Sequence, residues 1–551
     1  RFEVRERISS KGTVLQALDL DEIPVLTNTL QERKYHSVAI CCLFSFLHPE
    51  HEIMIAKALR KAGFFVSASH EVAPEYREYE RMSTTVINSY VSPVLDRYLA
   101  QIEAAIKPET PESPQLALQI MQSNGGILST SEARRFGVRC ILSGPAGGVV
   151  GCQHIAKMCK HPGFAQRVIT FDMGGTSTDV SLINGSPALT NEATIGGLPI
   201  RLPVLDIHTI GSGGGSIAWV DAGGALRVGP QSAGADPGPA CYGLGDPEHP
   251  EQMLPTVTDA NLLLGRLLPE FFLDGSLPLH PERAELAIGN LGEKRGLDSI
   301  RTALGMIAVA DAHMERALRL VSVERGHDPQ QFTLLSFGGA GGLHASNLAH
   351  KLGIPQVLIP PYASTLSALG MLAAAVEKDY TLTVMLPGTA NNDAVESAFQ
   401  PLLKRASEDL LNEGIVHKDQ VFSRSLEMRY AGQSYELPIA WPPTQAGLLA
   451  DFHNTYRQAY TYAHPEAPVE IVNLRLHAAG KRDPLTLPTF PSRSNNPTAA
   501  CLCEHPVILE SADRQLRYVI PGDWPQRHDI RWKRRQKNIC HFAKRRNQVD
   551  L

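Results

Sequence analysis

The sequence lacks the features that mark membrane and nucleic-acid-binding proteins. Its longest apolar run, Val38 to Leu47, is about half as long as a helix that spans a bilayer. The 52 basic and 57 acidic residues nearly balance and give a net charge of −5. Because neither sign of charge dominates, we expect no nucleic-acid or membrane surface across the body of the protein.

The sequence also lacks a cysteine pattern that would hold a metal ion or a full set of disulfides. The nine cysteines are an odd number, and no two of them form a CxxC pair. Scattered single cysteines are typical of reduced thiols, so we expect a cytoplasmic protein. They are Cys41, Cys42, Cys140, Cys152, Cys159, Cys241, Cys501, Cys503 and Cys540.

Core-forming residues, in contrast, are plentiful. Hydrophobic residues make up 43% and charged residues 20% of the 551 residues, as in ordinary globular proteins. The length predicts about three to four domains. The first residue is Arg rather than Met, so we expect the sequence to begin inside a longer protein.

Residues 167–184 (RVITFDMGGTSTDVSLIN) predict a hairpin with an unusual turn. Val168 to Phe171 and Val180 to Ile183 are apolar and β-branched, which predicts two buried strands. The glycines between them bend one strand back onto the next, whereas the glycines of a P-loop open a helix. An ordinary Gly-Gly hairpin turn is the alternative to a binding site.

The turn carries groups that suit phosphate and a cation. Backbone N–H groups and hydroxyls can face an oxyanion, and the two carboxylates at its rim, Asp172 and Asp179, can hold Mg²⁺ or an attacking water. We therefore take Asp172 and Asp179 as the candidate catalytic residues. The candidate phosphate ligands are Gly174, Gly175, Thr176 and Thr178.

Two further glycine-rich regions lie downstream. Residues 206–217 (DIHTIGSGGGSI) and 221–243 contribute little core, so approach of a ligand is one reason for them. His208 could touch a metal or a substrate there; a hydrogen-bonded loop residue is the alternative. Residues 337–342 (FGGAGG) lie between a predicted strand and a predicted helix, an arrangement that suits the sugar or phosphate side of a nucleotide.

Strand and helix patterns alternate along the chain and predict an α/β protein. Residues 38–67 predict a strand, a helix and a second strand as one βαβ unit. Ser92-Pro93 is a favourable N-cap and first helical residue, so a helix is predicted to begin there. Apolar residues at helical spacing predict a long helix over Ser299–Arg325, and residues 386–480 predict a smaller α+β region.

The segment FDMGGTSTDVSLI resembles the second phosphate motif of the hydantoinase A / 5-oxoprolinase family. Similar segments extend from the first residues to about Lys481, and the chain also resembles the β subunit of acetone carboxylase. The segments include SHEVAPEYREYER at 69–81, LSGPAGGVVG at 142–151, TIGSGGGSIA at 209–218, SAGADPGPACYG at 232–243 and FGGAGGLHA at 337–345.

The resemblance implies a two-lobed actin/sugar-kinase/Hsp70-like ATPase fold. Residues 1–165 would be the remainder of the first lobe, 166–385 the second lobe with the nucleotide motifs, and 386–480 a C-terminal α+β domain. Residues 481–551 would form a partly disordered linker and a basic tail. The family's first phosphate motif, D-x-G-G-T-F-T-D, is absent, and its loss would weaken nucleotide binding about a thousandfold.

The resemblance also implies a reaction that uses ATP and Mg²⁺. Asp172 would orient Mg²⁺ or the acceptor, and Gly338, Gly339 and Gly341 would line the adenosine side. The expected reaction is hydrolysis of a cyclic amide such as 5-oxoproline, as in glutathione metabolism, or a hydantoin. The expected partner is a hydantoinase B-type subunit or fused domain, in a homo- or hetero-oligomer. The alternatives are a ketone carboxylase subunit and a truncated remnant that only binds a partner.

Overall fold

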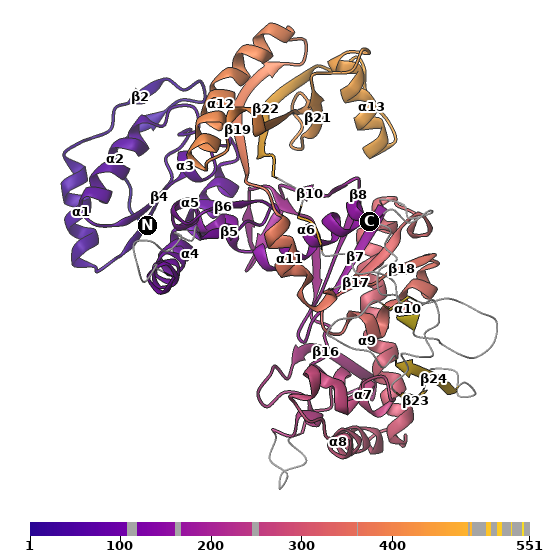
Figure 1. The fold of residues 1–551 in the computed structure, drawn as a ribbon. Helices are drawn as coiled ribbons and strands as arrows, with labels where there is room; N and C mark the ends of the chain where they lie inside the picture. Colours follow the sequence, from indigo (N-terminus) through magenta and orange to yellow (C-terminus); the bar gives the residue numbers. More distant parts are fainter. Residues whose placement is uncertain are drawn as a thin grey trace, which may run out of the picture. The chain divides into compact units, whose positions relative to one another are not determined.

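The computed structural model describes residues 1–106, 118–159, 167–244, 253–360, 362–482 and 485–487, and four strands beyond them, β23 to β26. These strands are Cys503–Ile508, Gln515–Ile520, Ile530–Arg531 and Ala543–Lys544. The chain mixes helices and strands throughout, which confirms the predicted α/β class (Figure 1). The predicted linker after residue 487 and most of the basic tail lie outside the described residues.

Contacts divide the chain into two units. The first contains Arg1–Ala146, Leu189–Leu205 and Ala374–Pro484, and the second contains Gly147–Ala188, Asp206–Ala373 and Leu485–Leu551. Both units are discontinuous along the chain, whereas the parts predicted from the sequence are continuous segments.

The predicted βαβ unit is present in the first unit. Strands β3 (Ser37–Ile40) and β4 (Phe65–Ala68) pair in parallel, and helix α2 (Glu50–Lys61) crosses between them. Helix α1 (Glu22–Glu32) adds to the same apolar core, in which Leu59 is completely buried. The apolar spacing of α2 thus places one face against the two strands.

Helix α4 does not begin at Ser92-Pro93 as predicted; it runs without interruption from Glu78 to Ala105. Pro93 has no N–H to donate to the carbonyl of Ser89, four residues earlier. The Ser37 hydroxyl donates to that carbonyl at 2.6 Å instead. A partner from strand β3 therefore satisfies the group that the proline leaves free, and the helix continues.

The C-terminal part of the first unit is an antiparallel sheet in the order β19-β22-β20-β21. The strands span Glu377–Pro387, Val469–Gly480, Gln420–Tyr430 and Leu437–Trp441. Helix α12 (Asn392–Asn412) packs on β22, and α13 (Leu448–Tyr460) packs on β21. Helices and strands are mixed over residues 386–480, as the sequence predicts, whereas β19 begins before that region, at Glu377.

A buried ion network joins the three segments of the first unit. The Arg201 guanidinium donates to Glu75 at 2.9 Å, and Arg475 donates to the other oxygen of Glu75 at 2.7 Å. Arg475 also donates to Glu427 at 2.9 Å. Removing one member would leave its partners charged and buried, which typically costs about 3–5 kcal/mol.

The second unit is built on a sheet in the order β14-β8-β7-β17-β18. The strands span Ile207–Ile210, Thr178–Asn184, Arg167–Met173, Thr333–Phe337 and Gln356–Leu358. Its core includes the buried faces of helices α9 (Ser299–Val321) and α10 (Gly341–Leu352). Strands β7 and β17 are parallel, so the chain ends both strands at the same edge of the sheet.

Glycines allow helix α6 (Ser143–Met158) to pack closely in the second unit. A side chain on Gly148 would meet the Phe337 ring at 2.7 Å, and one on Gly151 would meet the Leu366 carbonyl oxygen at 2.6 Å. Leu366 begins helix α11 (Leu366–Ala373). Gly147, Gly148 and Gly151 of LSGPAGGVVG therefore serve close packing, whereas Gly144 has open space around it. Most of the segment is helical.

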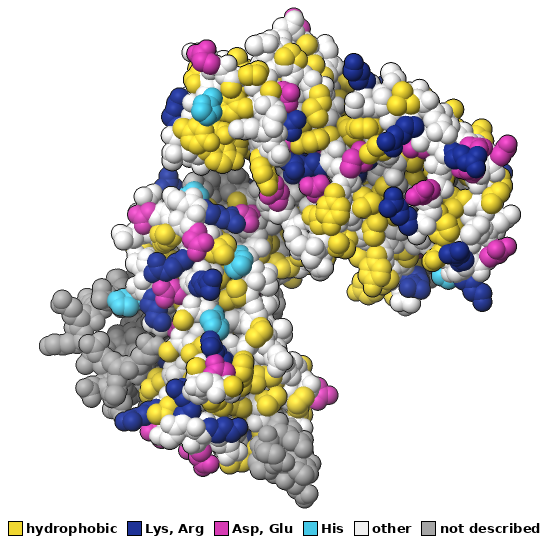
Figure 2. Space-filling model, turned by 180° about the vertical axis from the view of Figure 1, so that it is seen from behind, with side chains coloured by type: hydrophobic (Ala, Val, Ile, Leu, Met, Phe, Trp, Pro, Cys, Tyr) yellow, Lys and Arg dark blue, Asp and Glu magenta, His cyan; other side chains and the backbone are white. Residues whose placement is uncertain are grey.

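The charged side chains on the surface reflect the nearly equal numbers of basic and acidic residues. On the face shown in Figure 2, Lys and Arg side chains are interspersed with Asp and Glu. The six cysteines of the described ranges are free thiols. Among the helices of those ranges, none combines the length and apolar character needed to cross a bilayer.

His477 makes the stability of the first unit depend on pH. A hydrogen bond from its ring to Asp379, opposed by burial, raises the pKa of His477 to about 9. A raised pKa stabilises the fold fully below the unfolded value near 6.5, and this contribution is lost as the pH rises through 9. We expect His477→Gln to lower the free energy of unfolding by about 1 kcal/mol at pH 7, a value reduced for solvent screening.

Urea unfolding at several pH values measures this difference. The gap between the wild type and His477→Gln should close above pH 9, while the exposed His417→Gln control should follow the wild type throughout. A gap that stayed constant up to pH 10 would contradict the assignment of the stabilisation to the charged imidazole.

Candidate nucleotide site on the glycine loops

The predicted hairpin is present and sets Asp172 opposite Asp179. Strands β7 and β8 pair antiparallel with Asp172 in register with Asp179 and Met173 with Thr178. The Gly174 N–H donates to the Ser177 carbonyl at 3.0 Å and closes the turn. Gly175 and Thr176 are exposed at its tip. The two carboxylates therefore start from backbone positions that face each other across the hairpin.

Burial disfavours ionisation of both carboxylates, and the charge of Asp179 adds to this effect at Asp172. Burial, followed by the charge of Asp179, raises the pKa of Asp172 to about 6. Burial also raises the pKa of Asp179, against a hydrogen bond from the Thr209 hydroxyl that lowers it. A cation between the two groups would remove this penalty, which is why such pairs favour metal binding.

The loop 211–216 packs its backbone directly onto the hairpin turn. The Gly214 N–H donates to the Gly174 carbonyl at 3.0 Å, and the Gly215 N–H donates to the Gly175 carbonyl at 2.6 Å. A side chain on Gly213 would come within 2.6 Å of the Thr176 nitrogen. The glycines at 211–216 thus serve packing against the turn.

Thr178 belongs to this packing. Its side chain is completely buried, and its hydroxyl donates to the Ser212 carbonyl. The structure places Thr178 under the turn, where it fixes loop 211–216, and leaves Thr176 as the exposed threonine of the pair.

The FGGAGG loop packs against the same turn from strand β17. Gly338 has a φ of +78°, and a side chain there would lie 2.2 Å from an Asp172 carboxylate oxygen. The Ala340 N–H donates to the Met173 carbonyl at 2.9 Å. Gly341 is buried and begins helix α10, while Gly339 is exposed with open space around it. Three glycine-rich segments therefore converge on Asp172, and a helix N-terminus that favours anions follows one of them.

The structure places His208 away from the two carboxylates. In strand β14, Thr209 pairs with Asp179 and His208 pairs with Val180. Since successive side chains of a strand point to opposite faces, His208 lies on the face opposite Thr209 and Asp179. No group of three or more His, Cys, Asp and Glu side chains within the described ranges is arranged to hold a metal ion.

A buried polar cluster, formed by Asn261, Asp311, His344 and Asn347, lies behind the loops. Asp311 of α9 accepts from His344 Nδ1 at 2.6 Å and from Asn347 at 2.6 Å, both on α10. His344 Nε2 lies 3.3 Å from Asn261 Nδ2 on helix α7 (Val257–Leu263).

The cluster connects helices α7 and α10, which support loop 211–216 and the FGGAGG loop. Helix α10 follows the FGGAGG loop directly, and the α7 residue Thr258 donates to the Gly214 carbonyl with its N–H at 2.7 Å and its hydroxyl at 2.9 Å. None of the sequence motifs described above includes Asn261, Asp311 or Asn347 as a candidate site residue. The sequence did contain a signal for a buried polar residue, because Asp311 lies on the apolar face of α9 between Ile307 and Met314.

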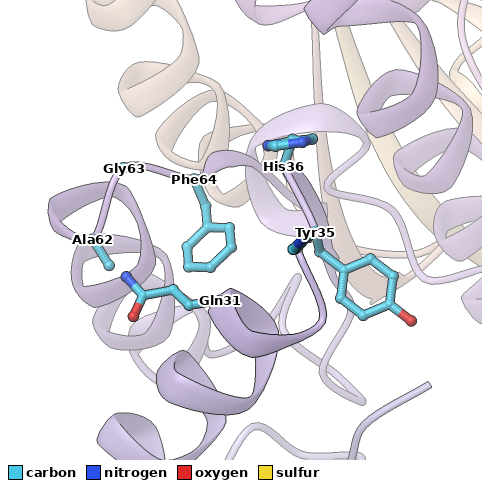
Figure 3. A pocket seen from close by; sticks show the side chains of 7 residues that line it. Gln31, Tyr35, His36, Ala62, Gly63 and Phe64 are labelled. Carbon is cyan, nitrogen blue, oxygen red and sulfur yellow. The ribbon is translucent and has the colours of Figure 1, made fainter.

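The first unit has a separate pocket of about 350 Å³ beside helix α1 (Figure 3). Gln31, Lys34, Tyr35, His36 and Phe64 line it together with Ala62 and Gly63. It contains no carboxylate that could hold a cation and none of the glycine loops, so we do not assign the nucleotide to it.

Comparison with known protein families shows to which family the chain belongs. The sequence model described as Hydantoinase/oxoprolinase matches residues 81–380, and that of the Hydantoinase/oxoprolinase N-terminal region matches residues 1–63. The chain belongs to the hydantoinase/oxoprolinase family. The resemblance inferred from the glycine motifs is thereby confirmed.

Caprolactamase subunit alpha of Pseudomonas jessenii is a similar family member. It is 36% identical over 544 residues, which cover 95% of this chain and 75% of the relative. The crystal structure of the ATP-dependent caprolactamase from the same organism matches with a TM-score of 0.83 at 32% identity, over 98% of this chain and 78% of that one.

Two other relatives differ in what they act on. The 5-oxoprolinase of Saccharomyces cerevisiae is 35% identical over 85% of this chain, which covers 36% of that longer protein. The nucleotide-free structure of acetone carboxylase matches with a TM-score of 0.71 at 26% identity, over 98% of this chain and 78% of that one. The family therefore includes ATP-dependent amide hydrolases and carboxylases.

Gly338→Ala tests the close approach to Asp172. The new side chain would collide with the carboxylate in a left-handed conformation that alone costs roughly 1–2 kcal/mol. We expect a loss of about 2 kcal/mol or more in the free energy of unfolding, measured in urea. Gly339→Ala is the matched control, since nothing lies within 4 Å of its added carbon. Equal effects of the two substitutions would contradict the packing described here.

Asp311→Ala tests the buried polar cluster. It leaves His344 buried without its acceptor and removes the acceptor of the partly buried Asn347, so we expect a loss of about 3 kcal/mol in the free energy of unfolding. Glu315→Ala on the same helix removes a surface pair with Arg319 and should cost less than about 1 kcal/mol. A cost for Asp311→Ala as small as that of the control would show that the cluster does not support the helices.

Proposed function

We propose that the chain is the nucleotide-handling subunit of an ATP-dependent cyclic amide hydrolase. The observation that carries the proposal is the convergence of three glycine-rich backbone segments on one pair of facing carboxylates, Asp172 and Asp179. Phosphoryl transfer needs positioning and charge neutralisation more than covalent chemistry by the protein. Exposed N–H groups, a helix N-terminus and a carboxylate pair supply both. The two-lobed actin-like ATPase fold is part of the same proposal.

In this proposal the carboxylates and the glycine loops have separate roles. The Asp172 and Asp179 carboxylates hold Mg²⁺, an ion that takes oxygen ligands and commonly combines one or two carboxylates with phosphate and water. Gly174, Gly175 and Thr176, at the open end of the turn, hold the phosphates. Gly339 lies at the adenosine side, with Gly338 and Gly341 shaping the loop beneath it. Mg²⁺ held by these carboxylates would supply neutralisation of the charge that develops on the transferred phosphate.

The substrate class follows from the family. Caprolactamase and 5-oxoprolinase are named for the amides that they open, and both are similar to this chain over most of its length. We infer that the amide oxygen attacks the γ-phosphate and ADP leaves. Water then adds to the phosphorylated carbon, and the ring C–N bond breaks as the nitrogen takes a proton. A second water hydrolyses the resulting acyl phosphate to a carboxylate and orthophosphate. The acetone carboxylase match favours a second candidate, in which a ketone enolate is the phosphate acceptor.

Substrate-dependent release of ADP separates these candidates. The chain is incubated with Mg·ATP and a panel of 5-oxoproline, hydantoin, caprolactam, and acetone with bicarbonate. Stimulation by a cyclic amide supports the hydrolase, and stimulation by acetone with bicarbonate supports the carboxylase. We expect full turnover to need a hydantoinase B-type partner. The name of caprolactamase subunit alpha indicates that this relative is one subunit of a larger assembly.

Binding of Mg·ATP should depend on Asp172 and on pH. Because the raised pKa of Asp172 lies near 6, the carboxylate is increasingly protonated below that pH and loses its affinity for Mg²⁺. We expect calorimetric affinity to fall at least tenfold between pH 8 and pH 5. Asp172→Asn should bind weakly at both pH values.

Asp179→Asn separates the charge effect from simple loss of a ligand. Removing the neighbouring charge lowers the pKa of Asp172, so the remaining pH dependence should shift to lower pH. Asp221→Asn, on an exposed turn of the same unit, is the control. Binding by Asp172→Asn that equals wild-type binding would rule out this site for the nucleotide.

A further inference from the structure

The second unit has an apolar pocket of about 390 Å³ beside loop 211–216. This volume is within the range of small-molecule sites, about 300–1,000 Å³. Segment 232–240, at the end of strand β16 (Leu226–Ser232), forms most of its wall. Apolar side chains from outside the segment complete the wall, namely Ile217, Leu244, Met253 and Leu254. The pocket is therefore built from a glycine- and proline-rich segment that is not one of the three loops around Asp172.

The wall of the pocket is uncharged. Of the described residues that line it, none is Asp, Glu, His, Lys or Arg, and Ser232 has the one polar side chain. A carboxylate or a phosphate would lose its water there without meeting a cation, which costs free energy. The pocket therefore suits an uncharged and largely apolar group.

Buried hydrogen bonds hold the pocket wall in place. Asp259 of helix α7 is completely buried, and its carboxylate accepts from the Cys241 N–H at 2.7 Å and from the Ala240 N–H at 3.2 Å. Gly238 has a φ of +72°, and a side chain there would lie 2.9 Å from the Ala235 carbonyl oxygen. The wall thus has a fixed shape before a ligand binds, which lowers the entropic cost of binding.

Gly215 connects this wall to the turn that is proposed to hold phosphate. A side chain on Gly215 would meet the Ser232 hydroxyl at 2.9 Å and the Gly175 carbonyl oxygen at 3.0 Å. The Gly215 carbonyl also accepts from the Ala233 N–H at 2.9 Å. The pocket wall therefore begins beside the turn and is joined to it through the backbone of one residue.

The preceding residue, Gly214, lies against the FGGAGG loop. A side chain on Gly214 would lie 3.9 Å from the Ala340 side chain. Ala340 follows Gly339, which lies at the proposed adenosine side. The adenosine side and the pocket wall are thus next to consecutive residues of loop 211–216.

We propose that this pocket binds the adenine base of the nucleotide whose phosphates are held at the Asp172 turn; the inference rests on the function proposed above. The base is flat and uncharged, and the ribose separates it from the phosphates, as Gly215 separates the pocket wall from the turn. The reacting oxygen of an amide must instead come within about 3–3.5 Å of the phosphate that it attacks. The carboxylate of 5-oxoproline would also meet no cation among the described lining residues.

Calorimetry with two ligands tests the base separately from the phosphates, because Mg·ATP carries the base and Mg·tripolyphosphate does not. We expect the wild type to bind Mg·ATP at least tenfold more tightly than Mg·tripolyphosphate. Ala233→Phe places a ring in the pocket from a half-buried position and should weaken Mg·ATP binding about twentyfold. Leu254→Ala removes an apolar contact and should weaken it about fivefold. Neither substitution should change the affinity for Mg·tripolyphosphate.

Two further variants serve as controls. Leu286→Ala on helix α8 (Pro281–Glu293) matches Leu254→Ala, since the two leucines are 46% and 44% exposed and Leu286 does not line the pocket. It should bind both ligands like the wild type. Asp172→Asn should weaken both ligands, because it acts at the phosphates. Thermal unfolding followed by circular dichroism confirms that each variant is folded.

The outcomes separate this inference from the proposed function. Wild-type affinity of Ala233→Phe and Leu254→Ala for Mg·ATP would overturn the inference and leave the proposed function intact. If these variants then weakened the stimulation of ADP release by caprolactam, the pocket would belong to the amide instead. Equal losses of affinity for both ligands would also overturn it, since the effect would then arise at the phosphates. A wild-type chain that binds neither ligand would contradict the proposed function and this inference together.

Discussion

The site depends on backbone approach where no side chain fits. Gly213 lies against the Thr176 nitrogen, and Gly338 lies against the Asp172 carboxylate, each closer than any side-chain carbon could come. Hydrogen bonds between backbone groups of the three loops then fix their register. The glycines therefore contribute because they have no side chain, which lets the backbones approach each other. This close approach sets the position of Asp172.

This constraint also sets the electrostatics. Antiparallel register places Asp172 opposite Asp179, and the loops packed around the hairpin remove much of the surrounding water. Burial raises the pKa values of both groups, and the charge of Asp179 raises that of Asp172 further, so ionisation of the pair is unfavourable in the free protein. A bound cation resolves it. Bringing the two carboxylates together costs free energy. The packing of the sheet and the Asp311 and His344 cluster behind the loops offset this cost, as is typical of functional sites.

Local patterns predicted the fold better than the contacts of the site. The hairpin at 167–184, the βαβ unit and the helix predicted over 299–325 follow from apolar spacing within a short window. The structure has all three, and it ends that helix at Val321. The helix start at Ser92 was wrong because a distant residue, Ser37, satisfies the carbonyl that Pro93 leaves free. The role of loop 211–216 and the burial of Thr178 depend on pairing across more than thirty residues, which no local pattern contains. The buried aspartate of α9 was visible in the sequence, but its partner His344 was not.

Hydrogen–deuterium exchange with and without Mg·ATP reports on the proposed site itself, because the site is made of backbone N–H groups. We expect slower exchange in residues 172–178, 211–216 and 338–343 when Mg·ATP is present, and no change around the pocket of Figure 3. Protection confined to that pocket, or unchanged exchange in all three loops at saturating Mg·ATP, would contradict the assignment of the nucleotide to the Asp172 hairpin.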